Sequence, residues 1–245
     1  AQTAYRLLRF FDERSADRLE GFELIPRETA EATIAHLPGA RAPLAKASAW
    51  YVLAEWVQDR AAQESPRALA ERLLGEAAER GLIEDAVPSA NEAQAEDFWR
   101  VRDSISEAER ALGPALQHDI SVPVGSMADF IESASARIEK AYPGTRAIAF
   151  GHLGDGNVHF HVRAPAGVCA EKWYRNDGES ISGAVYEMVV EAGGSISAEH
   201  GIGRAKRAEL ARLTPAARLG TLIAIKQALD PHGIMNPGKI VQAGD

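Results

Sequence analysis

Two histidines and one glutamate are the residues whose types and spacing point most directly to chemistry. His152 and His159 flank the turn residues Asp155-Gly156 in AIAFGHLGDGNVHFHV, and Glu199 follows later in SAEHGIG. Imidazole nitrogens and carboxylate oxygens bind zinc and other divalent metals. Two histidines and one carboxylate leave coordination positions free, which is typical of a catalytic metal site and not of a closed structural one.

A β-hairpin is expected to bring the two histidines together. Asp155-Gly156 favours a two-residue turn in which both positions take a positive φ. Centred there, the hairpin pairs His152 with His159, directly opposite each other and on one face. Opposed Cβ atoms lie about 4.5–5.5 Å apart, close enough for two imidazoles to share one ion. A stacked histidine pair without a metal fits the same spacing, so the residues alone leave both interpretations open.

The elements that would position these residues alternate along the chain. Apolar periodicity, capping residues and turn residues predict helices and strands. Strands are expected at 21–25, 49–57, 119–124, 146–153 and 157–163. Helices are expected at 4–11, 27–36, 65–80, 91–112, 126–141, near 182–191 and at 215–229. The strand at 49–57 is expected to be buried, and a capping box from Ser126 to Asp129 is expected to start the helix at 126–141. This order predicts an α+β fold, an antiparallel sheet with helices on one face.

Composition narrows the classes of function. The net charge of −8 over 245 residues argues against general nucleic-acid binding, which needs a basic surface. Cys169 is the single cysteine, so no intrachain disulfide can form and a cytoplasmic location is expected. No apolar run reaches the roughly 20 residues of a membrane span. Peripheral contact with the inner face of a membrane stays open, as does a homo-oligomer.

Three motifs in order resemble a known family. GHLGDGNVH, SAEHGIG and MNPGK are similar to the C-terminal substrate (cap) domain of FAD-linked oxidases of the vanillyl-alcohol-oxidase type. The most similar branch is the D-2-hydroxyglutarate and D-lactate dehydrogenases, and the similarity runs from about Phe22 to Lys239. Nothing in the sequence resembles an FAD-binding domain. We therefore expect a piece of a larger enzyme or a separately encoded subunit.

The resemblance implies a domain organisation. It implies a cap domain with a ferredoxin-like antiparallel sheet over residues 1–210, which carries the metal site. A C-terminal helical tail over residues 211–245 would then pack on the FAD-binding domain. The chain begins directly in a helix, so a first strand of the ferredoxin-like sheet is expected to lie outside this sequence.

The resemblance also implies roles for individual residues. His152, His159 and Glu199 would hold a divalent metal, expected to be zinc. His200 would be the general base that takes the substrate hydroxyl proton while hydride passes to the flavin. Arg102 would bind the substrate carboxylate with two parallel hydrogen bonds. By its residue type alone, Arg102 would be a solvated helix charge.

Further site residues follow from the same resemblance. Ser106 lies one helical turn beyond Arg102, and Asn236 and Lys239 would lie near the flavin ring. Gln117 stands where the hydroxyglutarate branch has a lysine, which favours a monocarboxylate such as D-lactate over a dicarboxylate. His161 stands where that branch usually has asparagine. It shares the face of His159, either as a further metal ligand or, as we prefer, as a residue that supports the site.

The implied function is the FAD-dependent oxidation of a D-2-hydroxy acid to its 2-oxo acid. D-lactate, D-2-hydroxyglutarate and glycolate are the candidate substrates, and an FAD-binding domain or subunit is the expected partner. One alternative is a non-catalytic module that binds a metal and a hydroxy acid and is inactive without a flavin partner. Another is a histidine-triad hydrolase, but Arg163 stands where that family has its third histidine.

Overall fold

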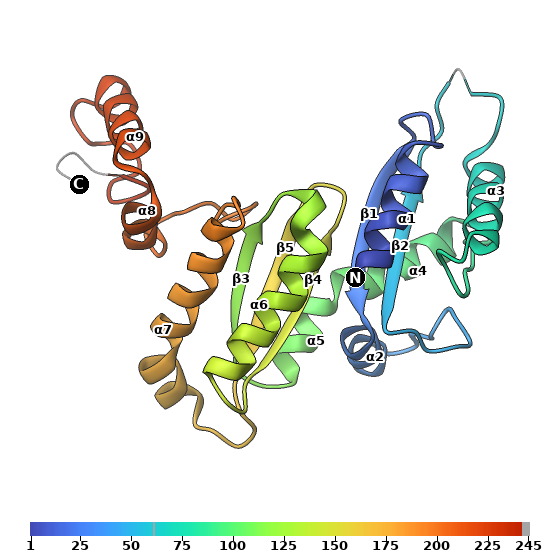
Figure 1. Cartoon of the computed structure of the whole chain (residues 1–245), viewed down its shortest axis with the longest axis horizontal. Coiled ribbons are helices and arrows are strands. Elements are labelled where there is room, and N and C mark those ends of the chain that lie inside the picture. Colours follow the sequence, from blue (N-terminus) through green and yellow to red (C-terminus); the bar gives the residue numbers. More distant parts are fainter. Residues whose placement is uncertain (61, 242–245) are drawn as a thin grey trace.

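Five antiparallel strands form one sheet through the middle of the molecule (Figure 1). The computed structural model describes residues 1–60 and 62–241. The strands are β1 (Leu19–Pro26), β2 (Trp50–Trp56), β3 (Ala115–Ser121), β4 (Arg146–His152) and β5 (Asn157–Arg163), in the spatial order β2-β1-β4-β5-β3. The expected α+β class with an antiparallel sheet is confirmed.

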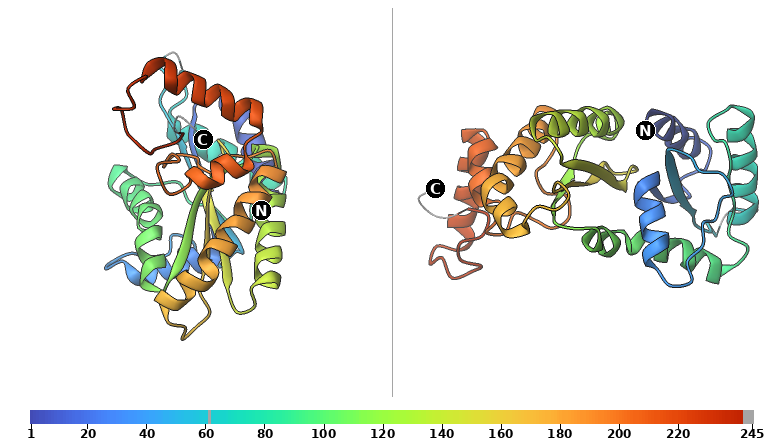
Figure 2. Two further views of the ribbon diagram at one scale, coloured as in Figure 1. Left: turned by 90° about the vertical axis from the view of Figure 1, so that its left-hand side faces the viewer. Right: turned by 90° about the horizontal axis from the view of Figure 1, so that it is seen from below.

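Helices surround this sheet and extend beyond it. They are α1 (Gln2–Asp12), α2 (Arg27–His36), α3 (Pro66–Glu79), α4 (Glu92–Asp103), α5 (Ile105–Ala111), α6 (Met127–Ala141), α7 (Ala170–Glu191), α8 (Arg207–Leu213) and α9 (Ala216–Leu229). A short 3-10 turn, η1 (Val124–Ser126), precedes α6. Figure 2 shows that α6 and α5 lie on opposite sides of β3, β4 and β5. No helix of the described residues is long and apolar enough to cross a membrane.

Alternate residues of β5 face two different cores. Val158, Phe160 and Val162 are fully buried in the larger core, to which α1, α3, α6 and α7 contribute. His159 and His161 therefore point to the opposite face. A smaller cluster lies on that face and joins α2 and α5 to the sheet: Ile25, Ala30, Ile105, Ile148 and Phe150. The site histidines thus belong to the side with the smaller core.

The sheet consists of two parts joined by a short seam. Strands β2 and β1 pair along most of their length, and β4, β5 and β3 do the same. Between β1 and β4 the described residues form only the pairs Glu23↔His152 and Leu24↔Gly151. One of the predicted metal ligands therefore sits on the seam.

The β4–β5 hairpin differs from the prediction by two residues of register. His159 pairs with Phe150, not with His152, and residues 153–156 form the loop. Of the two turn residues only Gly156 has a positive φ, of 80°, while the Asp155 side chain accepts a hydrogen bond from the backbone of Asn157 at 2.9 Å. A two-residue slip leaves every side chain on its face. His152 and His159 consequently share one face, as predicted.

The predicted helix over 91–112 is wrong as a single element, because it is broken between α4 and α5. Ser104 lies at the break, with φ −84° and ψ 0°, and serves as C-cap of α4 and N-cap of α5. Serine competes for backbone hydrogen bonds and so favours helix ends over helix interiors. The apolar stripe that predicted one helix continues across the break, because Ile105 remains buried in the smaller cluster.

Two further details of the prediction are corrected. Ser126 makes no capping hydrogen bond to α6, so the predicted capping box does not form. Its backbone is helical within η1, whereas a side-chain N-cap needs an extended residue. Strand β2 is half-buried and lies at the sheet edge, not in the interior as expected.

Several helices and strands begin or end at other residues than predicted. Strand β3 begins at Ala115 and ends at Ser121, instead of spanning 119–124. Helix α7 begins at Ala170, well before the expected 182–191, and α8 was not predicted at all. The expected division between cap and tail at residue 210 falls inside α8, and this division stays a prediction.

Candidate functional site

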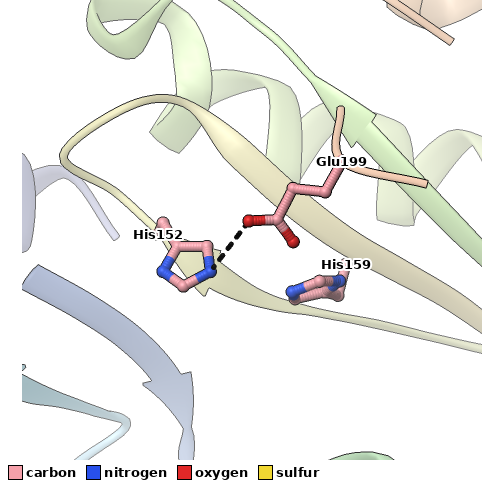
Figure 3. Close-up of side chains that lie close together, drawn as sticks. All are labelled: His152, His159 and Glu199. Atoms are coloured by element: carbon pink, nitrogen blue, oxygen red, sulfur yellow. Dashed lines mark ion pairs between the residues drawn. The ribbon is translucent and has the colours of Figure 1, made fainter. Parts of the chain in front are cut away.

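The three predicted metal ligands come together on the face with the smaller core. His152 ends β4, His159 lies within β5, and Glu199 comes from the loop between α7 and α8, pointing at both rings (Figure 3). One ligand atom of each lies within 4.8 Å of the others, and His152 Nε2 is 3.8 Å from Glu199 Oε1. The imidazoles are largely buried, whereas the Glu199 side chain is 56% exposed. Such a cluster has an open side.

Glu23 of β1 contacts His152 from behind. Its side chain is 2% exposed, and its carboxylate forms an ion pair with His152 Nδ1. Burial acts to raise the pKa of Glu23, but the hydrogen bond with His152 and the charge of Arg102 outweigh burial and lower it. The same hydrogen bond raises the pKa of His152 against the effects of burial and of Arg102. Nδ1 is thereby engaged, and Nε2 is the nitrogen that faces Glu199.

Arg102 joins the same group from α4. Its Nε donates to Glu23 at 3.0 Å, and its Nη2 lies 2.9 Å from His152 Nε2. A guanidinium can only donate hydrogen bonds, so this contact requires an unprotonated Nε2 and a proton on Nδ1. The Arg102 side chain is 15% exposed. The solvated helix charge that residue type alone would suggest is therefore not what the structure shows.

Asp119 of β3 organises the loop that carries Glu199. Its Oδ2 accepts from the backbone N–H groups of Glu199 and His200 at 2.9 and 2.8 Å. Its buried Oδ1 has no hydrogen-bond partner and lies 4.0 Å from His159 Nδ1. Burial acts to raise the pKa of Asp119, but the two backbone bonds lower it overall. Burial lowers the pKa of His159, which favours the neutral ring that binds metals.

His200 leaves the cluster and faces solvent. Its side chain is 72% exposed, and its Nδ1 lies 3.7 Å from Asp119 Oδ2. The hydrogen bond from the His200 backbone N–H to Asp119 fixes the main chain, while the imidazole ring stays accessible to solvent. An exposed imidazole beside a cluster of ligands can exchange a proton with solvent or with a bound molecule.

Gln117 and His161 form a cross-strand pair on the site face. They are opposite each other on β3 and β5, with Gln117 exposed and His161 only 4% exposed. Burial lowers the pKa of His161 to about 3, and its Nδ1 has no hydrogen-bond partner. The ring packs edge-on against Phe150, with centroids 5.1 Å apart. His161 is therefore a neutral ring beneath the site, and it does not belong to the three-ligand cluster.

The other predicted site residues lie farther along the chain. Ser106 is half-buried on α5, just beyond the helix break. Asn236 and Lys239 are exposed in the segment after α9, where Asn236 has a positive φ of 46° and accepts a backbone hydrogen bond from Lys239. The structure does not bring these two residues to the metal cluster, and a contact with a flavin stays a prediction.

Sequence reasoning missed Glu23 and Asp119. Both are carboxylates inside strands whose neighbours are apolar, in GFELI and HDISV. A buried charge in such a strand needs a partner, and this is the signal that could have marked them. Their partners are remote in sequence, however, so only the sheet pairing identifies them: Glu23 with His152, and Asp119 with His159.

A family model matches most of the chain. The model is that of FAD linked oxidases, C-terminal domain, and it matches residues 2–240. A D-2-hydroxyglutarate dehydrogenase of Xanthomonas citri pv. viticola is 34% identical over 232 residues, which are 95% of this chain and 48% of that protein. The mitochondrial D-2-hydroxyglutarate dehydrogenase of Arabidopsis thaliana is 32% identical over 223 residues, 91% of this chain and 38% of that protein.

A solved structure shares the fold. The 4-ethylphenol oxidase from Gulosibacter chungangensis, in its isoeugenol complex, superposes with a TM-score of 0.57 at 16% identity. The match covers 96% of this chain and 51% of that one. At this identity the likeness shows the fold alone. The chain thus spans about half the length of these proteins, or less.

Proposed function

Because the chain belongs to the FAD linked oxidases, C-terminal domain family, we propose that it is the substrate- and metal-binding part of an FAD-dependent dehydrogenase. The reaction is the oxidation of a D-2-hydroxy acid to its 2-oxo acid. The single observation that carries this proposal is the convergence of His152, His159 and Glu199 beside Arg102. Those residues offer a cation site and a carboxylate-binding group within one small region.

The donor set fits a divalent metal, and zinc is our first choice. Two neutral imidazole nitrogens and one carboxylate oxygen are a common zinc set with open positions. Both histidines have a carboxylate near the other ring nitrogen, Glu23 for His152 and Asp119 for His159. Such partners orient metal-binding imidazoles. When bound, the metal would lower the pKa of the substrate hydroxyl and the flavin would accept the hydride.

Arg102 would bind and orient the substrate carboxylate. Glu23 accepts a hydrogen bond from Arg102 Nε, and Arg102 Nη1 lies 3.7 Å from the exposed Asp103 carboxylate, so Nη2 is the nitrogen best placed for a second anion. In the structure Nη2 contacts His152 Nε2, the nitrogen that a metal would need. We propose that this contact is given up in the working site, and that Nη2 then donates to the substrate carboxylate. Ser106 would add a hydroxyl on the next helix.

His200 would take the proton of the substrate hydroxyl. It follows Glu199 in the chain, and its main chain is fixed by Asp119 while its ring stays accessible. An imidazole can accept a proton on one nitrogen and release one from the other, which suits a general base. The exposed side of the ring then gives the proton a route to water.

The substrate end beyond the hydroxyl would meet Gln117, with the buried His161 ring beneath it. Both are uncharged, because Gln117 is an amide and burial keeps His161 neutral. A second substrate carboxylate would gain no ion pair there, so a monocarboxylate such as D-lactate or glycolate fits this end better. The relatives compared above are named D-2-hydroxyglutarate dehydrogenases, so D-2-hydroxyglutarate remains the competing substrate.

The C-terminal tail would dock on an FAD-binding domain. Helix α9 has no buried residue, and large apolar side chains are exposed on it and on the segment after it: Ile225, Leu229, Ile234, Met235 and Ile240. An apolar surface of this kind marks an interaction site. Asn236 and Lys239 lie in the same segment, so docking would bring them to the flavin side.

The lone Cys169 fits a reducing compartment, and we propose the cytoplasm.

The proposal is tested by restoring the flavin partner. The chain, joined to or mixed with an FAD-binding domain, should reduce a dye with D-lactate, glycolate or D-2-hydroxyglutarate. These 245 residues alone should be inactive, because they match a C-terminal domain of FAD linked oxidases and the flavin is expected to be bound elsewhere in the enzyme. Dye reduction by the isolated chain, or none by the restored enzyme with any D-2-hydroxy acid, would contradict the proposal.

A further inference from the structure

We infer that Glu23 is a positioning residue that holds the metal ligand His152 and the substrate-binding Arg102 at once. The inference rests on the proposed function, because it deepens the roles assigned to those two residues. None of the three motifs GHLGDGNVH, SAEHGIG and MNPGK includes Glu23, which lies far upstream of them in the chain. We infer the role of Glu23 from its carboxylate, which contacts both His152 and Arg102.

The two carboxylate oxygens have separate tasks. Oε1 pairs with His152 Nδ1, and Oε2 accepts from Arg102 Nε at 3.0 Å. With Glu23 2% exposed, water cannot replace either partner easily. A buried carboxylate on Nδ1 keeps the proton there and leaves Nε2 as the ligand atom, which is how carboxylate–histidine pairs tune metal sites. Glu23 therefore determines which histidine nitrogen faces Glu199.

Glu23 reaches the site across the seam of the sheet. It lies on β1, whereas His152 lies on β4, and Glu23↔His152 is one of the two residue pairs described between those strands. Arg102 comes from α4, a third segment. The same side chain thus ties three segments together at the place where the metal and the substrate carboxylate would meet.

Metal affinity of the isolated chain is the first readout. Zn²⁺ affinity is measured by competition with a chromophoric chelator for the parent, Glu23→Gln and Glu109→Gln. Glu109 is the matched control, because it is also buried and accepts from an arginine, Arg163, at 2.7 Å. Glu23→Gln should weaken Zn²⁺ binding by about 10–100-fold, and Glu109→Gln should not. If the parent binds Zn²⁺, equal affinities for parent and Glu23→Gln, or equal losses in both variants, would overturn the inference.

The histidine tautomer is the second readout, and it needs no metal. Nitrogen-15 NMR of labelled histidines should show the His152 proton on Nδ1 in the parent and move it in Glu23→Gln. If the parent binds no Zn²⁺ but shows this change, the proposed function fails and the positioning role stands. An unchanged tautomer contradicts the role. Should Glu23→Gln not fold, Glu23→Asp replaces it, since a shortened carboxylate must still weaken Zn²⁺ binding if the role is real.

The restored enzyme gives a third readout. A purely structural role would lower the amount of folded enzyme without changing the constants of the folded fraction. A positioning role predicts that Glu23→Gln raises KM through Arg102 and lowers kcat through His152, and that Glu23→Asp recovers part of both. Unaltered constants in the folded variant would contradict it.

Discussion

At the residue scale, His200 has the most demanding proposed role. Its ring is exposed, and the chain fixes it mainly through the backbone bond to Asp119. We expect His200→Ala in the restored enzyme to slow flavin reduction by about 10²–10⁴-fold, as loss of a general base does. Bound metal should stay, because His200 is not in the ligand cluster. Stopped-flow flavin reduction checks this, and an unchanged rate would remove His200 from the mechanism.

His118 makes a prediction about pH and stability, away from the site. It lies on the larger-core face, bonded to the Phe160 carbonyl and the Ser182 hydroxyl, both at 2.9 Å. Burial lowers the pKa of His118 to about 4. In the unfolded chain the pKa of a histidine is near 6.5, so as pH falls the unfolded chain is protonated at this residue before the folded chain is. Its contribution to stability is therefore present above that pH and is lost between about pH 6.5 and 4.

The size of this loss follows from the shift of the pKa. Between pH 7 and pH 5, the preferential protonation of His118 in the unfolded chain should lower the unfolding free energy of the protein by about 2 kcal/mol. Urea unfolding at both pH values checks it, with His118→Asn as the comparison, since asparagine can keep the bond to Phe160. The variant should be less stable at pH 7 and lose less on acidification. An equal loss in both proteins would contradict the buried neutral state of His118.

The three residues of the proposed metal site could be identified from sequence as a group because they lie in short motifs. His152 and His159 flank one turn, and Glu199 lies among glycines. Glu23 and Asp119 could not, since nothing local distinguishes a paired buried carboxylate from an exposed one. Arg102 was ambiguous until its contacts with Glu23 and His152 were known.

At the element scale, the β4–β5 hairpin positions His152 and His159, two of the three proposed metal ligands. Gly156 closes it with φ 80°, and a Cβ there would lie 2.1 Å from the Val122 carbonyl oxygen. Gly156→Ala should therefore cost more than about 1 kcal/mol of unfolding free energy and weaken metal binding. Gly154→Ala is the control in the same loop, since its Cβ would meet nothing within 4 Å. Urea unfolding and Zn²⁺ titration of both variants check this, and similar behaviour of the two would contradict it.

The hairpin also shows which features the turn residues and apolar periodicity can predict and which they cannot. The predicted hairpin placed His152 and His159 on one face, and this is correct because a shift of two residues leaves every side chain on its face. The register was wrong, because Asp155 did not adopt the positive φ that a two-residue turn requires and bonded to Asn157 instead. The break at Ser104 was missed for a similar reason: the apolar stripe continues from α4 to α5 although the backbone does not.

At the scale of the whole molecule, the C-terminal tail is the part that exposes large apolar side chains, and we expect a partner to cover them. Leu229 on α9 is 72% exposed. Leu229→Glu should leave folding unchanged and weaken binding of an FAD-binding domain by about tenfold or more, because a buried leucine contributes about 1.5–3 kcal/mol. Val190→Glu on α7 is the control, as Val190 is exposed but lies outside the tail. Calorimetry with the flavin domain checks this, and equal affinities would place the docking surface elsewhere.

The overall class was predictable and the overall arrangement was not. Alternating strands and helices indicated an antiparallel α+β sheet, which the structure has. The two-part sheet depends on pairing between strands far apart in the chain, of which β1 and β4 share only two residue pairs. That seam is where Glu23 meets His152, so the site is a property of the assembled sheet and not of one motif.

Metal content is the measurement that tests the central claim most directly. Elemental mass spectrometry on the purified chain, supplied with zinc, manganese or iron, should find about one ion per chain. His159→Ala should lose it, and His232→Ala should keep it, because His232 is exposed and outside the cluster. A parent chain that binds none of these metals, or a His159→Ala variant that binds as much as the parent, would contradict the account.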